Sequence, residues 1–273
     1  MVGAPDLGAV YAACEAQARA HYENFPVASI LVPRALRGHI AALYAFARTA
    51  DDFADEGSWS AAERQQLLDG WERRLLAAAA SPAAGPVPTA GEPANSQAIF
   101  LALGASIRTL GLPVHLFERL LSAFRQDVTV GRYATWQDLL DYCRRSANPV
   151  GRLVLRISGY SDARLDAWSD AVCTALQLTN FWQDMKADAA RGRVYLPEGE
   201  TVPAAVARTR ALFQEGRPVC NAVRGRLRFE LRATWLGGVR ILDRIEQSGF
   251  DVISRRPTLT ARDMLWIAPR LLS

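Results

Sequence analysis

The sequence lacks features that would place it in several common classes. Its four cysteines are isolated and form no CxxC pair, so neither a zinc site nor a disulfide framework is predicted. Its three histidines lie far apart and match no metal-ligand spacing, so we expect them to be structural. These residues are Cys14, Cys143, Cys173, Cys220, His21, His39 and His115.

Apolar runs long enough to span a bilayer are missing, and no signal peptide is recognised. We therefore expect a cytoplasmic protein in a reducing compartment. The net charge is +4, but the positive residues are almost all arginines scattered along the chain, which predicts no nucleic-acid partner. No GxGxxG motif follows a predicted strand, so a Rossmann-type nicotinamide site is not expected either.

Strand signals are also nearly absent, and long segments rich in Ala, Leu and Arg predict an all-α protein. The 273 residues suit one large domain over 1–273, although length alone also permits two. A Pro-, Gly- and Ala-rich stretch at 81–95 is interpreted as a surface loop, because the helical pattern resumes after it. Pro149 is expected to interrupt a helix, and 217–248 to form one continuous helix.

The stretch at 40–56, IAALYAFARTADDFADE, organises the chain. On a helix of about 3.6 residues per turn, an aromatic hydroxyl, a guanidinium and two carboxylates fall on one face. Apolar or small residues surround this face, so the helix is expected to be largely buried. The residues on the face are Tyr44, Arg48, Asp51 and Asp55, with Asp52 at its edge.

A second stretch, LQLTNFWQDMKAD, repeats this design between Leu176 and Asp188. Four polar residues again share one helical face, and Leu176, Leu178, Phe181 and Trp182 cover much of the rest. A lone acidic motif is usually a solvated surface, but two buried helices with carboxylates are costly unless a cation lies between them. Mg²⁺ fits, because it takes oxygen ligands and shares them with phosphate. The polar residues are Gln177, Asn180, Asp184 and Asp188.

Three segments in order, FARTADDFADE, YCRRSANPVG and NFWQDMKADAARGRVYLP, resemble the squalene/phytoene synthase family of head-to-head prenyl transferases. The resemblance extends from about Phe25 to the C-terminal helices, and within the family it is strongest to the bacterial hydroxysqualene synthases of the hopanoid pathway. It implies the isoprenoid synthase helical bundle, with a central apolar pocket between two aspartate-bearing helices. It also implies several Mg²⁺ ions that bridge a prenyl diphosphate substrate.

The resemblance assigns roles to individual residues. Arg48 and Arg193 would bind phosphate oxygens, and Tyr44 and Tyr195 would donate hydroxyl hydrogen bonds. Asp52 is the less firmly assigned acid of the catalytic set. The metal ligands would be Asp51, Asp55, Asn180, Asp184 and Asp188. Further substrate-binding positions would be Gln177, Tyr142, Arg145 and Asn148.

The sequence departs from the wider family at two of these segments. Gln183 stands where many relatives have an arginine, and Arg145 replaces the second of two tyrosines in the YC segment. In reductive squalene synthases one tyrosine of this segment is assigned to the first condensation, and Tyr142 keeps one of the two candidates. Arg145 is interpreted either as a substrate contact or as a structural ion pair. The loss of the tyrosine favours an enzyme specialised for the second step.

We therefore expect an enzyme that converts presqualene diphosphate and water to hydroxysqualene and diphosphate with Mg²⁺ and without a nicotinamide. One alternative is condensation of two prenyl diphosphates to presqualene diphosphate, dehydrosqualene or phytoene. Another is a non-catalytic assembly factor, which the four costly aspartates argue against. A lipid product would suit peripheral contact with the inner face of the membrane and with neighbouring enzymes of the hopanoid pathway.

Overall fold

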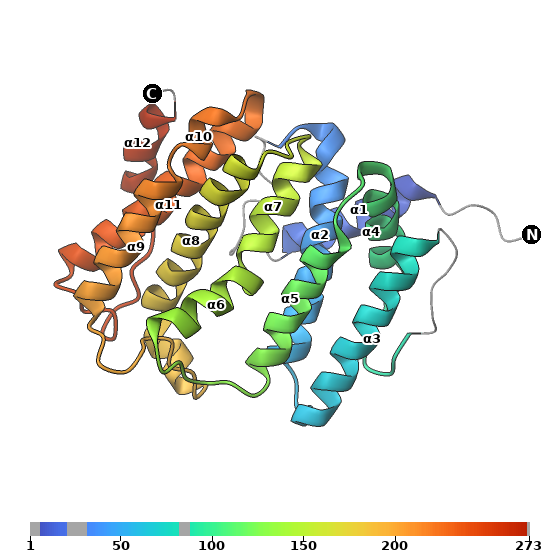
Figure 1. Ribbon diagram of the computed structural model, residues 1–273, viewed down its shortest axis with the longest axis horizontal. Coiled ribbons are helices and arrows are strands. Elements are labelled where there is room, and N and C mark those ends of the chain that lie inside the picture. Colours follow the sequence, from blue (N-terminus) through green and yellow to red (C-terminus); the bar gives the residue numbers. More distant parts are fainter. Residues whose placement is uncertain (1–5, 21–31, 82–87, 272–273) are drawn as a thin grey trace, which may run out of the picture. The chain divides into compact units, whose positions relative to one another are not determined.

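The computed structural model describes residues 6–20, 32–81 and 88–271, and this part of the chain is built from α-helices (Figure 1). The described residues contain no strand beyond one isolated bridge between Arg132 and Val194, which confirms the all-α prediction. The helices are α1 Leu7–Ala20, α2 Arg34–Asp55, α3 Ala61–Ala80, α4 Ser96–Leu110, α5 Val114–Asp127, α6 Trp136–Ser146, α7 Asn148–Ile157, α8 Ala163–Ala190, α9 Val202–Gly216, α10 Val219–Ala222, α11 Gly225–Gln247 and α12 Ala261–Arg270.

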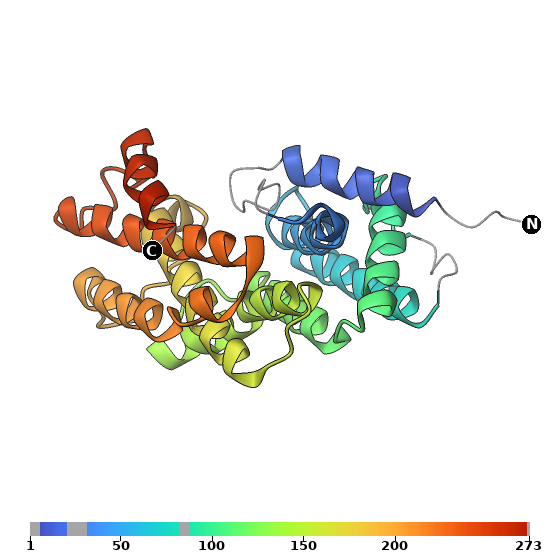
Figure 2. The same ribbon diagram turned by 90° about the horizontal axis from the view of Figure 1, so that it is seen from above.

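The chain divides into two compact units, whose helices are drawn in Figure 2. The first unit comprises Met1–Thr129 and Leu153–Tyr160, and the second comprises Val130–Arg152 and Ser161–Ser273. The single domain over 1–273 stays a prediction. His21 and residues 82–87 of the expected surface loop lie outside the described part. Within that part, no helix has both the length and the apolar character needed to cross a bilayer.

Helix α2 is the centre of the first unit, where it packs against α1, α3, α4 and α5. Its inner face is apolar and carries Phe46, whose ring lies 5.9 Å from that of Trp71. Trp71 in turn packs on Phe100 at 4.4 Å and donates from Nε1 to the carbonyl of Phe46 at 3.2 Å. This aromatic core fixes the rotation of α2, and therefore which of its residues face outward.

A buried ion pair joins α3 to the segment before α4. The side chains of Arg74 and Glu92 are each only 1% exposed, and the guanidinium bonds the carboxylate directly. Arg74 also donates to Ser96 Oγ at 2.9 Å and to Gln97 Oε1 at 2.6 Å. The described end of the expected surface loop is therefore anchored by a buried carboxylate.

Helix α8 is the longest element of the second unit and packs mainly against α9, with α6, α10 and α11 around it. Asp162 caps its start by accepting from the backbone N–H of Arg164 at 2.7 Å. Trp182, fully buried, donates to Thr209 Oγ1 on α9 at 2.9 Å. These contacts settle which face of α8 remains outside the core.

Two predicted features of the chain path have different outcomes. The interruption at Pro149 is confirmed, since α6 ends at Ser146 and α7 begins at Asn148. The single helix over 217–248 is wrong, because α10 ends at Ala222 and α11 begins only at Gly225. Val223 between them is extended, with ψ 163°, and Gly225 has φ 65°, which favours glycine.

We expect Glu92→Gln to lower the free energy of unfolding by about 3 kcal/mol or more, because it leaves Arg74 charged and buried without its partner. Urea denaturation would measure the change. The matched control is Glu15→Gln, which breaks the exposed Arg19–Glu15 pair and should cost less than about 1 kcal/mol. Equal effects of the two substitutions would show that burial of the Arg74 pair is not important for stability.

Candidate functional site

The acidic face of α2 is organised around Arg48. Its Nη2 lies 2.6 Å from Asp52 Oδ1, and its Nη1 lies 3.4 Å from Asp51 Oδ2. All three side chains are partly exposed, as are Tyr44 and Asp55 on the same helix. The face predicted from the sequence is therefore formed, and Asp52, expected at its edge, makes the shorter contact with the arginine.

On this face the pKa values of the Tyr44 hydroxyl and the Arg48 guanidinium are raised, so both groups stay protonated and can donate hydrogen bonds. Burial raises the pKa of the Tyr44 hydroxyl, Arg48 partly lowers it, and Asp52 and Asp51 raise it further. For Arg48 burial lowers the pKa, but the two carboxylates outweigh burial and the net pKa is raised. Arg48 Nε is buried and has no hydrogen-bond partner among the described residues. A buried donor of this kind suits an incoming oxyanion.

The corresponding face of α8 carries Gln177, Asn180, Asp184 and Asp188. Asn180 is exposed and the other three side chains are partly buried. Leu178, Phe181 and Trp182 fill the opposite side as expected, whereas Leu176 is only partly buried. The helix thus turns side-chain oxygens away from its apolar side.

Arg256 is a member of this site that the sequence analysis missed. Its guanidinium binds both oxygens of Asp184 through Nε and Nη2, the second contact being 3.0 Å. Beside it, Gln183 donates from Nε2 to the carbonyl of Pro257 at 2.5 Å. The segment between α11 and α12 is therefore fixed against α8. No local pattern predicts this contact, because 72 residues separate the two partners.

The loop after α8 brings Arg193 and Tyr195 back beside the helix. The backbone N–H of Arg193 donates to the carbonyl of Asp188 at 2.9 Å, which closes the helix end. The ring of Tyr195 stacks on Phe181 at 3.7 Å, with an interplanar angle of 9°. Tyr142 on α6 lies 6.3 Å from the Tyr195 ring. Three predicted positions are therefore grouped at one end of α8.

Arg145 and Asn148 have structural partners of their own. Arg145 donates from Nη2 to Asp141 Oδ2 at 3.0 Å, which is the ion pair that the sequence analysis offered as one alternative. Asn148 is buried and accepts at Oδ1 from Thr174 Oγ1 at 2.9 Å, which ties α7 to α8. A substrate role for either residue stays a prediction.

The donor set is chemically suited to Mg²⁺. Among the described residues, no group of three or more His, Cys, Asp and Glu side chains is arranged as a metal site. Three of the predicted carboxylates are bound by arginines instead, Asp51 and Asp52 by Arg48 and Asp184 by Arg256. The donors themselves are carboxylate and amide oxygens, which are the ligands that Mg²⁺ prefers, and Arg48 Nε offers an unused donor for a phosphate.

Comparison with known proteins gives the family. The squalene/phytoene synthase family model matches residues 18–202 and 199–263. The hydroxysqualene synthase of Zymomonas mobilis is 41% identical over 179 residues, which cover 64% of this chain and 54% of that protein. The chain thus spans about half the length of the first curated relatives it matches, at 54% to 55%.

Solved structures with a similar fold include proteins named squalene synthase and dehydrosqualene synthase. The squalene synthase HpnC from Alicyclobacillus acidocaldarius has a TM-score of 0.78 and 39% identity, covering 90% of this chain and 96% of that one. A dehydrosqualene synthase has a TM-score of 0.80 at 19% identity, covering 98% and 96%, and shows the fold alone. The chain belongs to the squalene/phytoene synthase family. The expected isoprenoid synthase fold and the resemblance to this family are confirmed.

We expect Arg256→Gln to bind Mg²⁺ more tightly than the unchanged protein in the absence of diphosphate, because the guanidinium no longer competes for the oxygens of Asp184. Isothermal titration calorimetry would measure the affinity. The matched control is Arg255→Gln, which removes the same charge one position earlier. Because the Arg256 pair is exposed, at 53% and 30%, stability should change by less than about 1 kcal/mol. Equal affinities in the two variants would contradict competition at Asp184.

Proposed function

We propose that this protein converts presqualene diphosphate and water to hydroxysqualene and diphosphate. The observation that supports this most is that α2 and α8 each carry carboxylates on one face. An arginine binds a carboxylate on each face, and buried apolar side chains fill the opposite side of each helix. The similarity to hydroxysqualene synthases adds the product class. The proposal includes a prenyl diphosphate as substrate, an intracellular location, and peripheral contact with a membrane and with neighbouring hopanoid enzymes.

The metal part of the proposal assigns ligands only. Asp51 and Asp55 would hold Mg²⁺ on one face, and Asn180, Asp184 and Asp188 on the other. When bound, Mg²⁺ neutralises negative charge on the leaving diphosphate. Arg48 and Arg193 add charge-assisted hydrogen bonds to phosphate oxygens, and the protonated Tyr44 hydroxyl donates another. Asp52 positions Arg48 through their 2.6 Å contact.

The bond between carbon and the diphosphate oxygen breaks, and the electron pair leaves with diphosphate. The remaining carbocation rearranges, a water oxygen adds to it, and one proton of that water is released. Apolar and aromatic side chains suit this step because they exclude bulk water. Phe181, Tyr195 and Tyr142 form such a surface beside the α8 face. No oxidant or reductant is needed.

The main alternative is a head-to-head condensation that ends in a hydrocarbon or in presqualene diphosphate. It is favoured by the structural relative from Alicyclobacillus acidocaldarius, which is named a squalene synthase. A reductive ending would need a hydride donor such as NADPH. A non-catalytic assembly factor is less well supported, because it has no need for so many partly buried carboxylates.

Replacing one acid on either face should nearly abolish turnover. We expect Asp51→Ala and Asp184→Ala to lose at least about a thousandfold, because metal-held charge stabilisation is worth several kcal/mol and each 1.36 kcal/mol is about tenfold in rate. The matched control is Glu56→Ala, an exposed acid just after α2, which should keep near-normal turnover. Near-normal turnover in either aspartate variant, or full activity in excess EDTA, would overturn the mechanism.

The source of the hydroxyl oxygen separates the proposed reaction from a reductive one. With presqualene diphosphate and Mg²⁺ in ¹⁸O-labelled water, we expect a labelled alcohol without any nicotinamide. Mass spectrometry of the product would measure the label. Squalene as the main product only when NADPH is added, or an unlabelled alcohol, would assign the chain to another branch of the family.

A further inference from the structure

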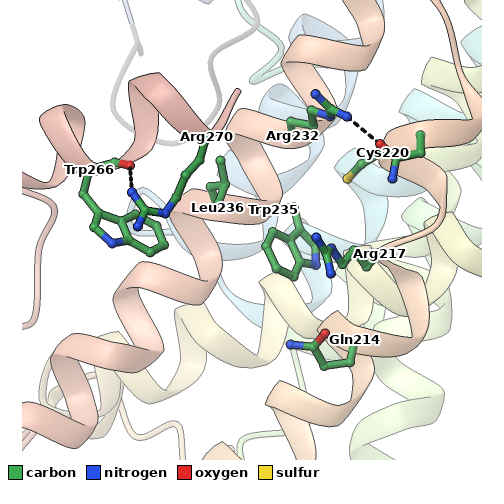
Figure 3. A pocket seen from close by; sticks show the side chains of 9 residues that line it. Gln214, Arg217, Cys220, Arg232, Trp235, Leu236, Trp266 and Arg270 are labelled. Atoms are coloured by element: carbon green, nitrogen blue, oxygen red, sulfur yellow. Dashed lines mark hydrogen bonds between the residues drawn. The ribbon is translucent and has the colours of Figure 1, made fainter. Parts of the chain in front are cut away.

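The second unit contains a cavity of about 310 Å³ between the end of α9, α10, α11 and α12 (Figure 3). Its walls include three arginines, two tryptophans and an asparagine. Figure 3 shows Arg217 beside Trp235 and Arg270 beside Trp266, with Arg232 above Trp235 in this view. The lining residues used below are Arg217, Arg232, Arg270, Trp235, Trp266 and Asn221.

The charged side chains among the described residues that line the cavity are all arginines. Three guanidinium groups line it, and no aspartate or glutamate is among the lining residues. The sequence around the cavity is also rich in arginine, with one acid, Glu230, between Arg217 and Arg232. Its arginines are Arg217, Arg224, Arg226, Arg228 and Arg232.

Arg232 is the least expected of these groups, because it is only 7% exposed. It donates from Nη2 to Asn221 Oδ1 at 2.6 Å and from Nη1 to the carbonyl of Leu271 at 2.7 Å, and both acceptors are neutral. Arg74, buried in the first unit, bonds a carboxylate instead. These are its acceptors in the part of the chain that the structure describes. A buried guanidinium with neutral acceptors is costly, and an external anion would relieve the cost.

A second arginine converges on the same acceptor. Arg228 donates from Nη2 to Asn221 Oδ1 at 3.5 Å, and its Nε is buried without a hydrogen-bond partner among the described residues. The pKa of the Cys220 thiol is also affected by nearby arginines. Burial raises the pKa of Cys220 to about 11, while Arg232 and Arg217 act in the opposite direction.

The two tryptophans give the cavity aromatic walls. Arg217 lies over the ring of Trp235 at 5.6 Å, and Arg270 lies over the ring of Trp266 at 4.2 Å. Trp235 is held in place by donating from Nε1 to the carbonyl of Phe213 at 2.7 Å. Guanidinium groups stacked on aromatic rings are well oriented for planar or tetrahedral oxyanions.

This cavity is separate from the acidic face of α8. Trp168, near the start of that helix, lines the space adjoining the cavity together with Arg217 and Asn221. Asp184 lies 16 positions later, which corresponds to about 24 Å along a helix. A ligand here would therefore not be the diphosphate held by Asp184.

We propose that the cavity binds an oxyanion of the phosphate class, carried by a ligand with an apolar or aromatic portion. The guanidinium groups of Arg217, Arg232 and Arg270 bind the oxygens, and the tryptophans contact the rest of the ligand. The ligand is either a free phosphate ester or the headgroup of an anionic lipid. This inference does not rest on the proposed reaction.

Binding of phenyl phosphate to the full chain in EDTA tests the site, because metal-dependent binding of diphosphate at the acidic faces is then absent. We expect Arg217→Gln and Arg270→Gln each to weaken binding at least about tenfold by calorimetry. Arg232→Gln is less useful alone, since it also removes the tie to Leu271. The control is Arg262→Gln, an exposed arginine of α12 that does not line the cavity.

A parallel arm measures sedimentation with vesicles of phosphatidylglycerol and of phosphatidylcholine. Phenyl phosphate binding that depends on Arg217 supports the site with a free phosphate ester as ligand. Binding only to phosphatidylglycerol vesicles, again lost in Arg217→Gln, supports it with a lipid headgroup. No binding in either arm, or equal weakening in Arg262→Gln, would overturn the proposal and leave the proposed reaction untouched.

Discussion

Carboxylates that share one helix face repel one another, and an arginine offsets this repulsion on each acidic face. Asp51 and Asp52 on α2 are held by Arg48, and Asp184 on α8 is held by Arg256. A divalent ion would compete with these arginines for the same oxygens, because both offer positive charge at short range. The arginines released in that exchange would be free to bind phosphate.

The same rule holds elsewhere in the chain. Asp263 is fully buried; burial raises its pKa, but hydrogen bonds from Thr260, Arg240 and Arg244 outweigh that effect and hold the pKa well below its usual range. Its ionised form therefore stabilises the fold above about pH 4, the usual value for the unfolded chain, and this contribution is lost as the pH falls further. The buried guanidinium of Arg232 differs, since both of its acceptors among the described residues are neutral, and this difference motivates the proposed anion site.

The spacing of apolar residues predicted the main helices, because a helix that buries one side repeats apolar residues about every 3.6 positions. The outward face of α2, including Tyr44 and Arg48, followed from helical spacing, since aromatic packing at Phe46 fixes the opposite side. The break before Gly225 was missed, because it depends on one extended residue and one positive φ within a helical composition. Arg256 was missed for a different reason, as its contact with Asp184 exists only after folding.

The central claim is that each acidic face binds diphosphate through divalent ions. A crystal structure with Mn²⁺ and an unreactive prenyl thiodiphosphate would test it most directly through anomalous scattering. The account predicts metal peaks bonded to Asp51 and Asp55 and to Asp184 and Asp188, with Arg256 displaced from Asp184. Diphosphate bound without metal peaks at these residues, while Arg48 and Arg256 keep their present carboxylate partners, would contradict it.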